Sequence, residues 1–110
     1  MAEKIYNKLV RDRVPEYIHQ NGDVPMTRVL SELEFVAALK EKLVEEAKEV
    51  GVAESKLEIL EELADCQEVI NALTAAMGAS PRLLKSIQER KALEKGNFSR
   101  RLFLEKVEEK

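Results

Sequence analysis

The sequence predicts an all-α protein in which a helical hairpin and a third helix assemble into a four-helix-bundle core by oligomerisation. Three long segments begin with a serine-led capping sequence and continue with apolar residues at helical spacing. Glycine or proline separates these segments. The core must be aliphatic, because the 110 residues include three Phe, two Tyr and no Trp. A small aliphatic helical domain gains stability when it buries helix faces against another copy of itself.

Residues 1–110 are expected to form a single domain, since the length suits one domain and the composition does not shift along the chain. Residues 1–30 are predicted to be an irregular arm, because prolines and a glycine interrupt them. The helical core covers residues 31–96. In the tail, residues 97–110, the apolar residues 102–104 could form a short strand or a docked extension.

Within the arm, a brief helix is predicted near Glu16 to Gln20. The first long helix is predicted to begin at the capping box Ser31-Glu-Leu-Glu34, to reach about Val50 and to stop at Gly51. It is followed by a short connection, so the next helix should run antiparallel to it.

A second capping box, Ser55-Lys-Leu-Glu58, predicts a helix that runs to Met77 and ends at Gly78. Ser80 and Pro81 then supply an N-cap and a first-turn proline for a third helix, which should end near Gly96.

The composition also limits the class of protein. A single cysteine, Cys66, excludes an intrachain disulfide and fits a reducing, cytoplasmic location; helical spacing suggests that it is a small core residue. No stretch is long and apolar enough to cross a membrane. The net charge of −3 argues against a nucleic-acid polymer as the main partner.

Two glutamates lie among apolar residues of the long helices. On a helical wheel of about 100° per residue, Glu46 lies roughly 60° from Leu43, the centre of the first apolar stripe. Glu62 lies roughly 100° from Leu63, the centre of the second stripe. Ionised carboxylates are rarely enclosed without compensation, so something should neutralise them.

An antiparallel hairpin brings two acidic pairs to the same height. Glu46 and Glu49 lie nine and six residues before Ser55, and Glu62 and Asp65 lie seven and ten residues after it. Each pair has i, i+3 spacing, which is used in helical bundles that build carboxylate metal sites. An all-oxygen ligand set selects Mg²⁺, with Mn²⁺ as a substitute.

The alternative is a solvated charged face with i, i+4 pairs such as Lys42 with Glu46. Two enclosed acids at matching heights favour the metal site. On the third helix, Lys91 falls near the inward face, where it could bind phosphate or extend along the helix edge toward solvent.

Three groups of residues resemble a known family. The sequence Glu45-Glu46-Ala-Lys-Glu49, followed by Glu61-Glu62-Leu-Ala-Asp65, resembles the paired EExxE and ExxD pattern of MazG-like nucleotide pyrophosphohydrolases. This all-α superfamily also includes phosphoribosyl-ATP pyrophosphohydrolase. The opening Tyr6-Asn-Lys-Leu-Val-Arg-Asp12, with Pro15 after it, looks like the phosphoribosyl-ATP pyrophosphohydrolase-like branch, as do Lys91, Gly96, Phe98 and Arg101 near the other end.

The resemblance implies a helical dimer or tetramer that cleaves a nucleoside triphosphate between its α and β phosphates, in a house-cleaning role. It gives Glu46, Glu49, Glu62 and Asp65 as catalytic Mg²⁺ ligands. The substrate contacts that it implies are Lys8, Arg11, Asp12, Lys91 and Arg101.

Glu45 and Glu61 match the first positions of the two doublets, but both point away from the apolar arcs, so Glu45 is only a weak candidate for orienting water. The chain departs from the family where Gly96 is followed by Asn97 instead of a second glycine. Hydrolysis of phosphoribosyl-ATP would use the same acids on a different nucleotide. A non-catalytic helical oligomer that binds a nucleotide or a protein is the further alternative.

Overall fold

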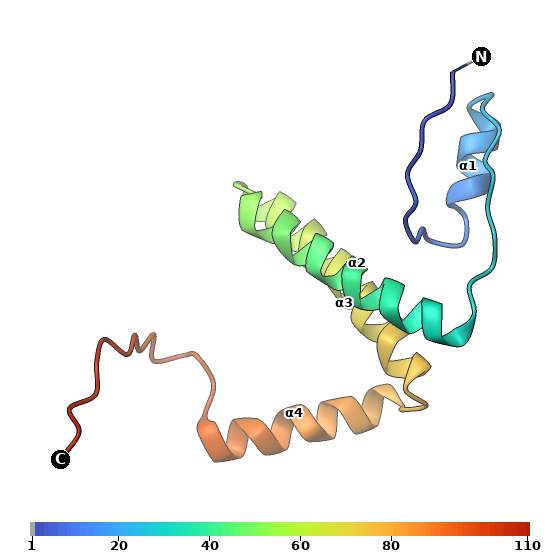
Figure 1. The fold of residues 1–110 in the computed structure, drawn as a ribbon. Coiled ribbons are helices and arrows are strands. Elements are labelled where there is room, and N and C mark those ends of the chain that lie inside the picture. The colour runs from blue at the N-terminus through green and yellow to red at the C-terminus, as the bar shows by residue number, and fades with distance from the viewer. Residues whose placement is uncertain (1) are drawn as a thin grey trace.

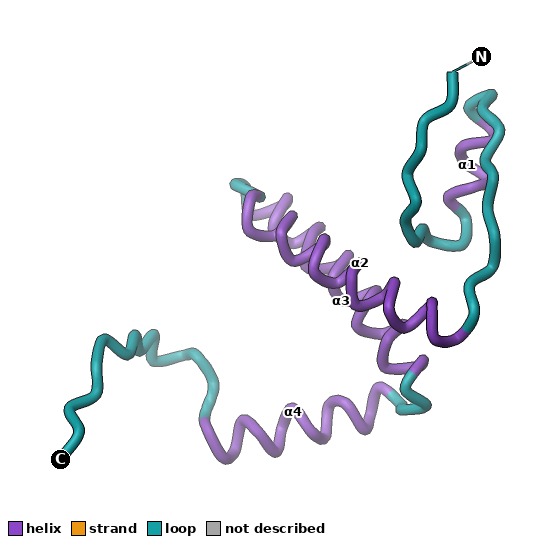
Figure 2. Tube along the Cα trace, viewed as in Figure 1, coloured by secondary structure: helices purple, strands orange, loops and turns teal. Residues whose placement is uncertain are grey.

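A computed structural model describes residues 2–110, and within them the regular elements are four helices (Figure 1). These are α1 (Val14–Gln20), α2 (Glu32–Val52), α3 (Lys56–Ala76) and α4 (Pro81–Lys95). The described part of the chain contains no strand, so the all-α prediction is confirmed (Figure 2). No described helix has a stretch that could cross a membrane.

The helices α2 and α3 pack against each other as the predicted hairpin, joined by residues 53–55. The helix α4 contacts α3 and leads away from the hairpin, and the tail continues beyond it (Figure 1). The chain is therefore extended, with dimensions of 67 × 35 × 28 Å and a radius of gyration of 18.8 Å. A compact chain of this length has a radius of gyration of about 13 Å.

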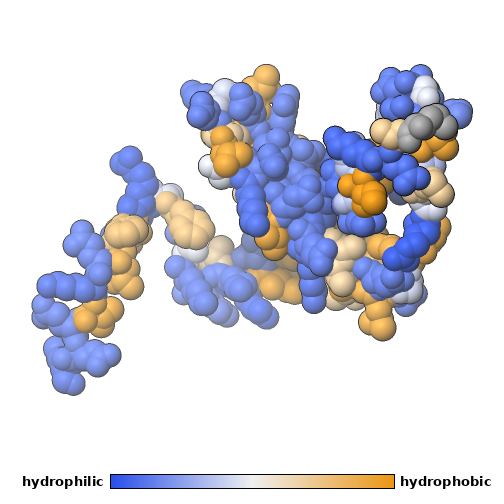
Figure 3. All heavy atoms as spheres, turned by 45° about the horizontal axis from the view of Figure 1, so that its top comes forward, coloured by the Kyte–Doolittle hydropathy of each residue, from blue (hydrophilic) through white to orange (hydrophobic). Residues whose placement is uncertain are grey.

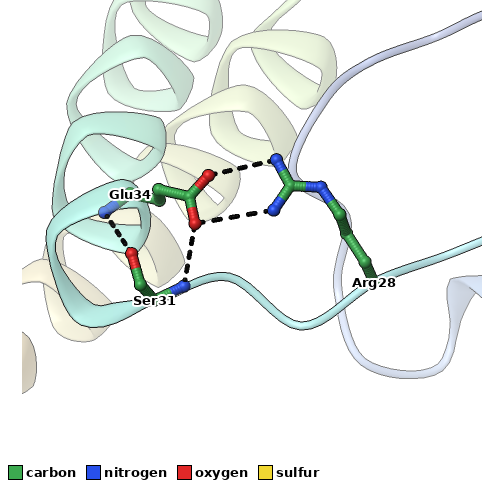
Figure 4. A network of polar contacts seen from close by, with 3 residues as sticks. All are labelled: Arg28, Ser31 and Glu34. Atoms are coloured by element: carbon green, nitrogen blue, oxygen red, sulfur yellow. Dashed lines mark hydrogen bonds and ion pairs between the residues drawn. The ribbon is translucent and has the colours of Figure 1, made fainter.

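Three residues fix the start of α2 (Figure 4). The Glu34 backbone N–H donates to the Ser31 hydroxyl, and the Ser31 N–H donates to the Glu34 carboxylate, each at 3.2 Å. Arg28 Nη2 donates to the same carboxylate at 3.1 Å. The hydrogen bond from Arg28, followed by those from Ser31, lowers the pKa of Glu34 to about 2. The predicted capping box is confirmed, and Arg28 reinforces it.

The other two predicted N-caps are present with one difference. The Ser80 hydroxyl accepts from the Leu83 N–H at 3.1 Å, and the Ser55 hydroxyl accepts from the Glu58 N–H at 3.1 Å. The Glu58 carboxylate accepts from the Glu54 N–H instead of the Ser55 N–H, so the second capping box is only half formed.

The glycines differ in how they end helices. Gly78 and Gly96 have φ of +72° and +84° and follow α3 and α4 as predicted, a conformation that favours glycine. The prediction that Gly51 ends the first long helix is wrong, because α2 continues to Val52 and ends at an extended Ala53.

The arm and the tail have little regular structure. The brief helix predicted in the arm is present as α1 and begins two residues earlier than expected, at Val14. Residues 97–110 are exposed and form neither of the structures predicted for them, a strand or a docked extension. After Gly96, the Ser99 N–H donates to Asn97 Oδ1 at 3.0 Å, so the asparagine closes a side-chain turn where the resembled family has a second glycine.

The hairpin buries the flanks that contain the acids. Leu39 and Val69, with 3% and 8% exposure, are its buried hydrophobic residues. The covered flank of α3 includes Glu62, whereas Leu63 is 48% exposed. The stripe centred on Leu63 is thus only partly covered within the single chain, because α2 packs on the neighbouring flank. Its full burial was expected to require a second copy and stays a prediction.

A large part of the apolar surface is left uncovered (Figure 3). The accessible surface of the chain is 10714 Å², whereas a compact monomer of 12.5 kDa exposes about 6,200 Å². Five of the exposed residues lie on the outer flanks of the hairpin, namely Leu33, Val44, Leu57, Leu60 and Leu63.

Candidate metal centre

Three carboxylates meet between the two helices of the hairpin. Glu46 comes from α2, and Glu62 and Asp65 come from α3. Each offers an oxygen that lies within 4.8 Å of an oxygen of the other two, and all three residues are half-buried. The i, i+3 spacing of Glu62 and Asp65 places both on the flank that faces α2.

Two basic residues partly neutralise this cluster. Lys42 Nζ lies 3.4 Å from Glu46 Oε1 and 3.6 Å from Glu45 Oε1, and its side chain is only 18% exposed. Arg11 Nη2 donates to Asp65 Oδ1 at 2.7 Å, which joins the N-terminal arm to α3. The Lys42–Glu46 pair of the charged-face alternative is thus present, but it is enclosed rather than solvated.

Glu62 differs from its two neighbours because no described lysine or arginine forms an ion pair with it. Burial raises the pKa of its carboxyl, and the negative charges of Asp65, Glu49, Glu46 and Glu61 add to this effect. Glu62 is therefore the acid of the cluster whose ionised form is least compensated by positive charge.

Glu49, the fourth predicted ligand, is not part of the close group. Its side chain is exposed, although its charge contributes to the raised pKa of Glu62. Glu45 and Glu61, at the first positions of the two doublets, are also exposed, and Glu45 pairs with Lys42. The structure thus brings together three of the four predicted ligands.

The predicted substrate contacts are dispersed. Arg11 reaches the acids, whereas Lys8 lies over the Tyr6 ring with its Nζ 5.6 Å from the ring centroid, and Asp12 is exposed. Lys91 and Arg101 are exposed on α4 and the tail, which lead away from the hairpin (Figure 1). Among the described residues, the structure records no hydrogen bond or ion pair between either of them and the acids.

Sequence reasoning did not foresee the role of two groups at this site. It treated Lys42 as a partner in a solvated pair, although a basic residue one turn before an enclosed glutamate is a signal for an enclosed ion pair. It also gave Arg11 only as a substrate contact, because no sequence pattern predicts which acid an irregular arm will reach.

The cysteine lies beside the acids. Cys66 is half-buried, and burial, followed by the charges of Glu46, Asp65 and Glu62, raises the pKa of its thiol. The thiol is therefore protonated near neutral pH, which agrees with a packing role.

The donor set fits a hard divalent cation. Carboxylate oxygens are the ligands that Mg²⁺ and Mn²⁺ prefer, and Mg²⁺ is commonly held by one or two carboxylates together with substrate phosphates. Among the described residues, the close cluster contains neither histidine nor cysteine as a ligand, so zinc has no support.

The comparisons with known proteins give a short match. No protein-family model and no solved structure matches the chain. Over 54 residues, the chain is 46% identical to an uncharacterized protein of Mycolicibacterium smegmatis (strain ATCC 700084 / mc(2)155). The match covers 49% of this chain and 55% of that protein, so the chain spans about half the length of this curated relative.

Proposed function

We propose that the chain is a Mg²⁺-dependent nucleotide pyrophosphohydrolase that cleaves a nucleoside triphosphate between its α and β phosphates. The observation that supports this most is the cluster of Glu46, Glu62 and Asp65, whose oxygens lie within 4.8 Å of one another between two helices. The paired acidic motifs that resemble those of MazG-like enzymes support the same reaction.

Glu46, Glu62 and Asp65 are the residues that would hold the cation, with Glu49 beside them as the fourth ligand implied by the resemblance. Bound Mg²⁺ supplies charge neutralisation and Lewis-acid polarisation for the phosphate oxygens. These acids would hold the cation, and their own negative charge would then be screened from an anionic substrate. Basic side chains then bind the remaining phosphate oxygens.

Two of the proposed substrate contacts, Lys8 and Arg11, are basic residues of the N-terminal arm. Arg11 already reaches the acids, since it pairs with Asp65. We propose that Lys91 and Arg101 contribute from a neighbouring copy, since α4 and the tail extend away from the hairpin of their own chain (Figure 1).

We propose a homodimer or homotetramer in which the outer flanks of two hairpins close a four-helix core. Each chain exposes about 4,500 Å² more than a compact monomer of its mass, which is surface that association with other copies could bury. An apolar groove of about 310 Å³ between the hairpin and α4, lined by residues that include Leu43, Ile70 and Leu83, adds a further surface for the second copy.

Pyrophosphate release tests the proposal. The full-length protein, supplied with Mg²⁺, is screened against canonical, deoxy and damaged nucleoside triphosphates and against phosphoribosyl-ATP. We expect Mg²⁺-dependent pyrophosphate release from at least one of them and none in the presence of a chelator. Absence of release from every nucleotide with both Mg²⁺ and Mn²⁺ would contradict the proposal.

The competing function is that of a non-catalytic helical oligomer, which is favoured by one observation: Lys42 and Arg11 already neutralise two of the acids. Thermal unfolding with and without Mg²⁺ distinguishes the two. A cation at one hundred times its dissociation constant adds about 2.7 kcal/mol to the free energy of unfolding, whereas acids paired only with their own lysine and arginine show no such gain.

A further inference from the structure

The contact between Arg11 and Asp65 joins two segments that are far apart in the sequence. It is a charge-assisted hydrogen bond of 2.7 Å across 54 positions, and it links the irregular arm to the middle of α3. Asp65 is also one of the three acids of the candidate metal centre. One carboxylate therefore serves both as the anchor of the arm and as a proposed ligand.

We infer that Arg11 is the built-in counter-ion of the metal-free site, and that a divalent cation displaces it from Asp65 and so releases the N-terminal arm. This inference rests on the proposed metal site. It assigns to Arg11 a role that precedes substrate binding, and it makes the position of the arm depend on the cation.

Charge repulsion is the physical reason for the exchange. The Arg11 guanidinium donates to Asp65 Oδ1 at 2.7 Å, so a cation held by Glu46, Glu62 and Asp65 would repel a positive group bound to one of its own ligands. Both partners of the Arg11–Asp65 pair are substantially exposed, at 59% and 42% of their side-chain surface, so water can solvate the released arginine at little cost. Lys42 is enclosed at 18% exposure and stays with Glu46.

The released arginine suits the next step of the proposed reaction. A guanidinium that has lost its carboxylate partner is a bidentate donor for phosphate oxygens. Cation binding would thus make the site more positive for an anionic substrate in two ways. It would neutralise the acids, and it would free the side chain of Arg11 next to them.

The arm contains a matched control. Arg13 lies two residues from Arg11 and pairs only within the arm, with its Nε 3.4 Å from Glu16 Oε2. Arg11→Gln and Arg13→Gln remove the same charge from the same segment, but only Arg11→Gln removes the contact with α3.

Direct binding of Mn²⁺, measured by electron paramagnetic resonance of the free ion without nucleotide, tests the competition. We expect Arg11→Gln to bind Mn²⁺ about two- to fivefold more tightly than the wild type, which corresponds to the strength of an exposed ion pair. Arg13→Gln should bind like the wild type. Equal or weaker binding by Arg11→Gln would overturn the inference while leaving the metal site intact, and no binding by any variant would refute the metal site itself.

Chymotrypsin cleavage after the exposed Tyr6 reports the arm independently of metal affinity. Mn²⁺ should accelerate this cleavage in the wild type and in Arg13→Gln. In Arg11→Gln and in Asp65→Asn the cleavage should already be fast without metal and should not respond to it, while circular dichroism confirms that the helices are intact. Cleavage at the same rate in all four proteins with and without Mn²⁺, whether slow or fast, would overturn the inference.

Discussion

At the scale of single residues, Glu62 combines enclosure with the lack of a basic partner. Lys42 and Arg11 each pair with a neighbouring acid, and the pKa of Glu62 is raised by burial and by four surrounding acids. A residue in this position destabilises the metal-free protein when it is ionised. A bound cation would remove this repulsion, and the free energy so gained would strengthen cation binding.

We expect Glu62→Gln to lower Mg²⁺-dependent pyrophosphate release by at least about a hundredfold, because loss of even a supporting contact to a ligand typically costs ten- to a hundredfold. The same variant should unfold at a higher temperature than the wild type without metal, since it removes repulsion. Full activity at saturating Mg²⁺ would exclude Glu62 from the site, and a lower apo melting temperature would show that it has a stabilising partner.

The pH dependence of stability should reveal the same carboxyl. Because its folded-state pKa lies above the ordinary value of 4.5, the folded chain binds the proton more tightly than the unfolded chain. The stability from this group is present below pH 4.5 and is lost as the pH rises through the raised pKa.

The advantage of Glu62→Gln over the wild type in melting temperature should therefore be largest near neutral pH and disappear toward pH 4. Glu34 has the opposite shift, to about 2, so its stabilisation is lost as the pH falls from 4.5 toward 2. Since Glu34 is present in both proteins, its contribution cancels in the comparison. An advantage that does not change between pH 4 and 8 would contradict the assignment to this carboxyl.

At the scale of elements, local signals in the sequence predicted the helices well. Each of the three N-cap serines accepts a hydrogen bond from the backbone three residues later, because this geometry depends only on the residues of one turn. Gly51 shows the limit of such signals. A glycine ends a helix only when the chain must take a positive φ there, and at Gly51 the helix continues for one more residue.

Ser31→Ala should lower the free energy of unfolding by about 1 kcal/mol, because it removes the hydroxyl that accepts from the Glu34 N–H in the first turn of α2. Chemical denaturation measures the change. Ser99→Ala, on the exposed tail, is the control and should have almost no effect. Equal effects of the two changes would mean that the cap in Figure 4 contributes nothing to stability.

The site was predicted less completely than the helices. The sequence placed Glu46 and Glu62 on enclosed flanks, and the structure has both half-buried in the hairpin. The helical wheel also places Glu62 on the flank that contains Val69 and Leu73, and α2 covers this flank, whereas Leu63 at the centre of the stripe stays 48% exposed. The burial of Leu63 depends on what else packs against the chain, which the pattern of one helix does not reveal.

At the scale of the whole molecule, the outer flanks of the hairpin carry exposed apolar residues that association with a second copy could cover. Leu60 and Leu63 of α3 are 62% and 48% exposed, and the tail adds further exposed apolar residues (Figure 3). Large exposed apolar patches are typical of interaction sites, so these residues support the proposed assembly.

Light scattering at micromolar concentration should therefore give a mass of at least twice the 12.5 kDa of one chain. Leu63→Lys places a charge on the outer flank and should shift the protein toward the monomer, whereas Lys56→Glu, which is exposed at the start of α3, should not. A wild-type mass near 12.5 kDa with pyrophosphohydrolase activity retained would refute the shared core.

The separation of Arg11 and Asp65 along the chain also has a consequence for folding. Glu46 and Asp65 belong to two helices joined by a three-residue connection, so they meet as soon as this local hairpin forms. The arm must close a loop of 54 positions before its arginine arrives, and closing a longer loop costs more chain entropy. During folding, the acids are therefore together before their arm counter-ion is in place. If the proposed metal site binds a divalent cation, that cation would offset the repulsion among the acids at this stage, and we expect the hairpin to form faster with Mg²⁺ than without it.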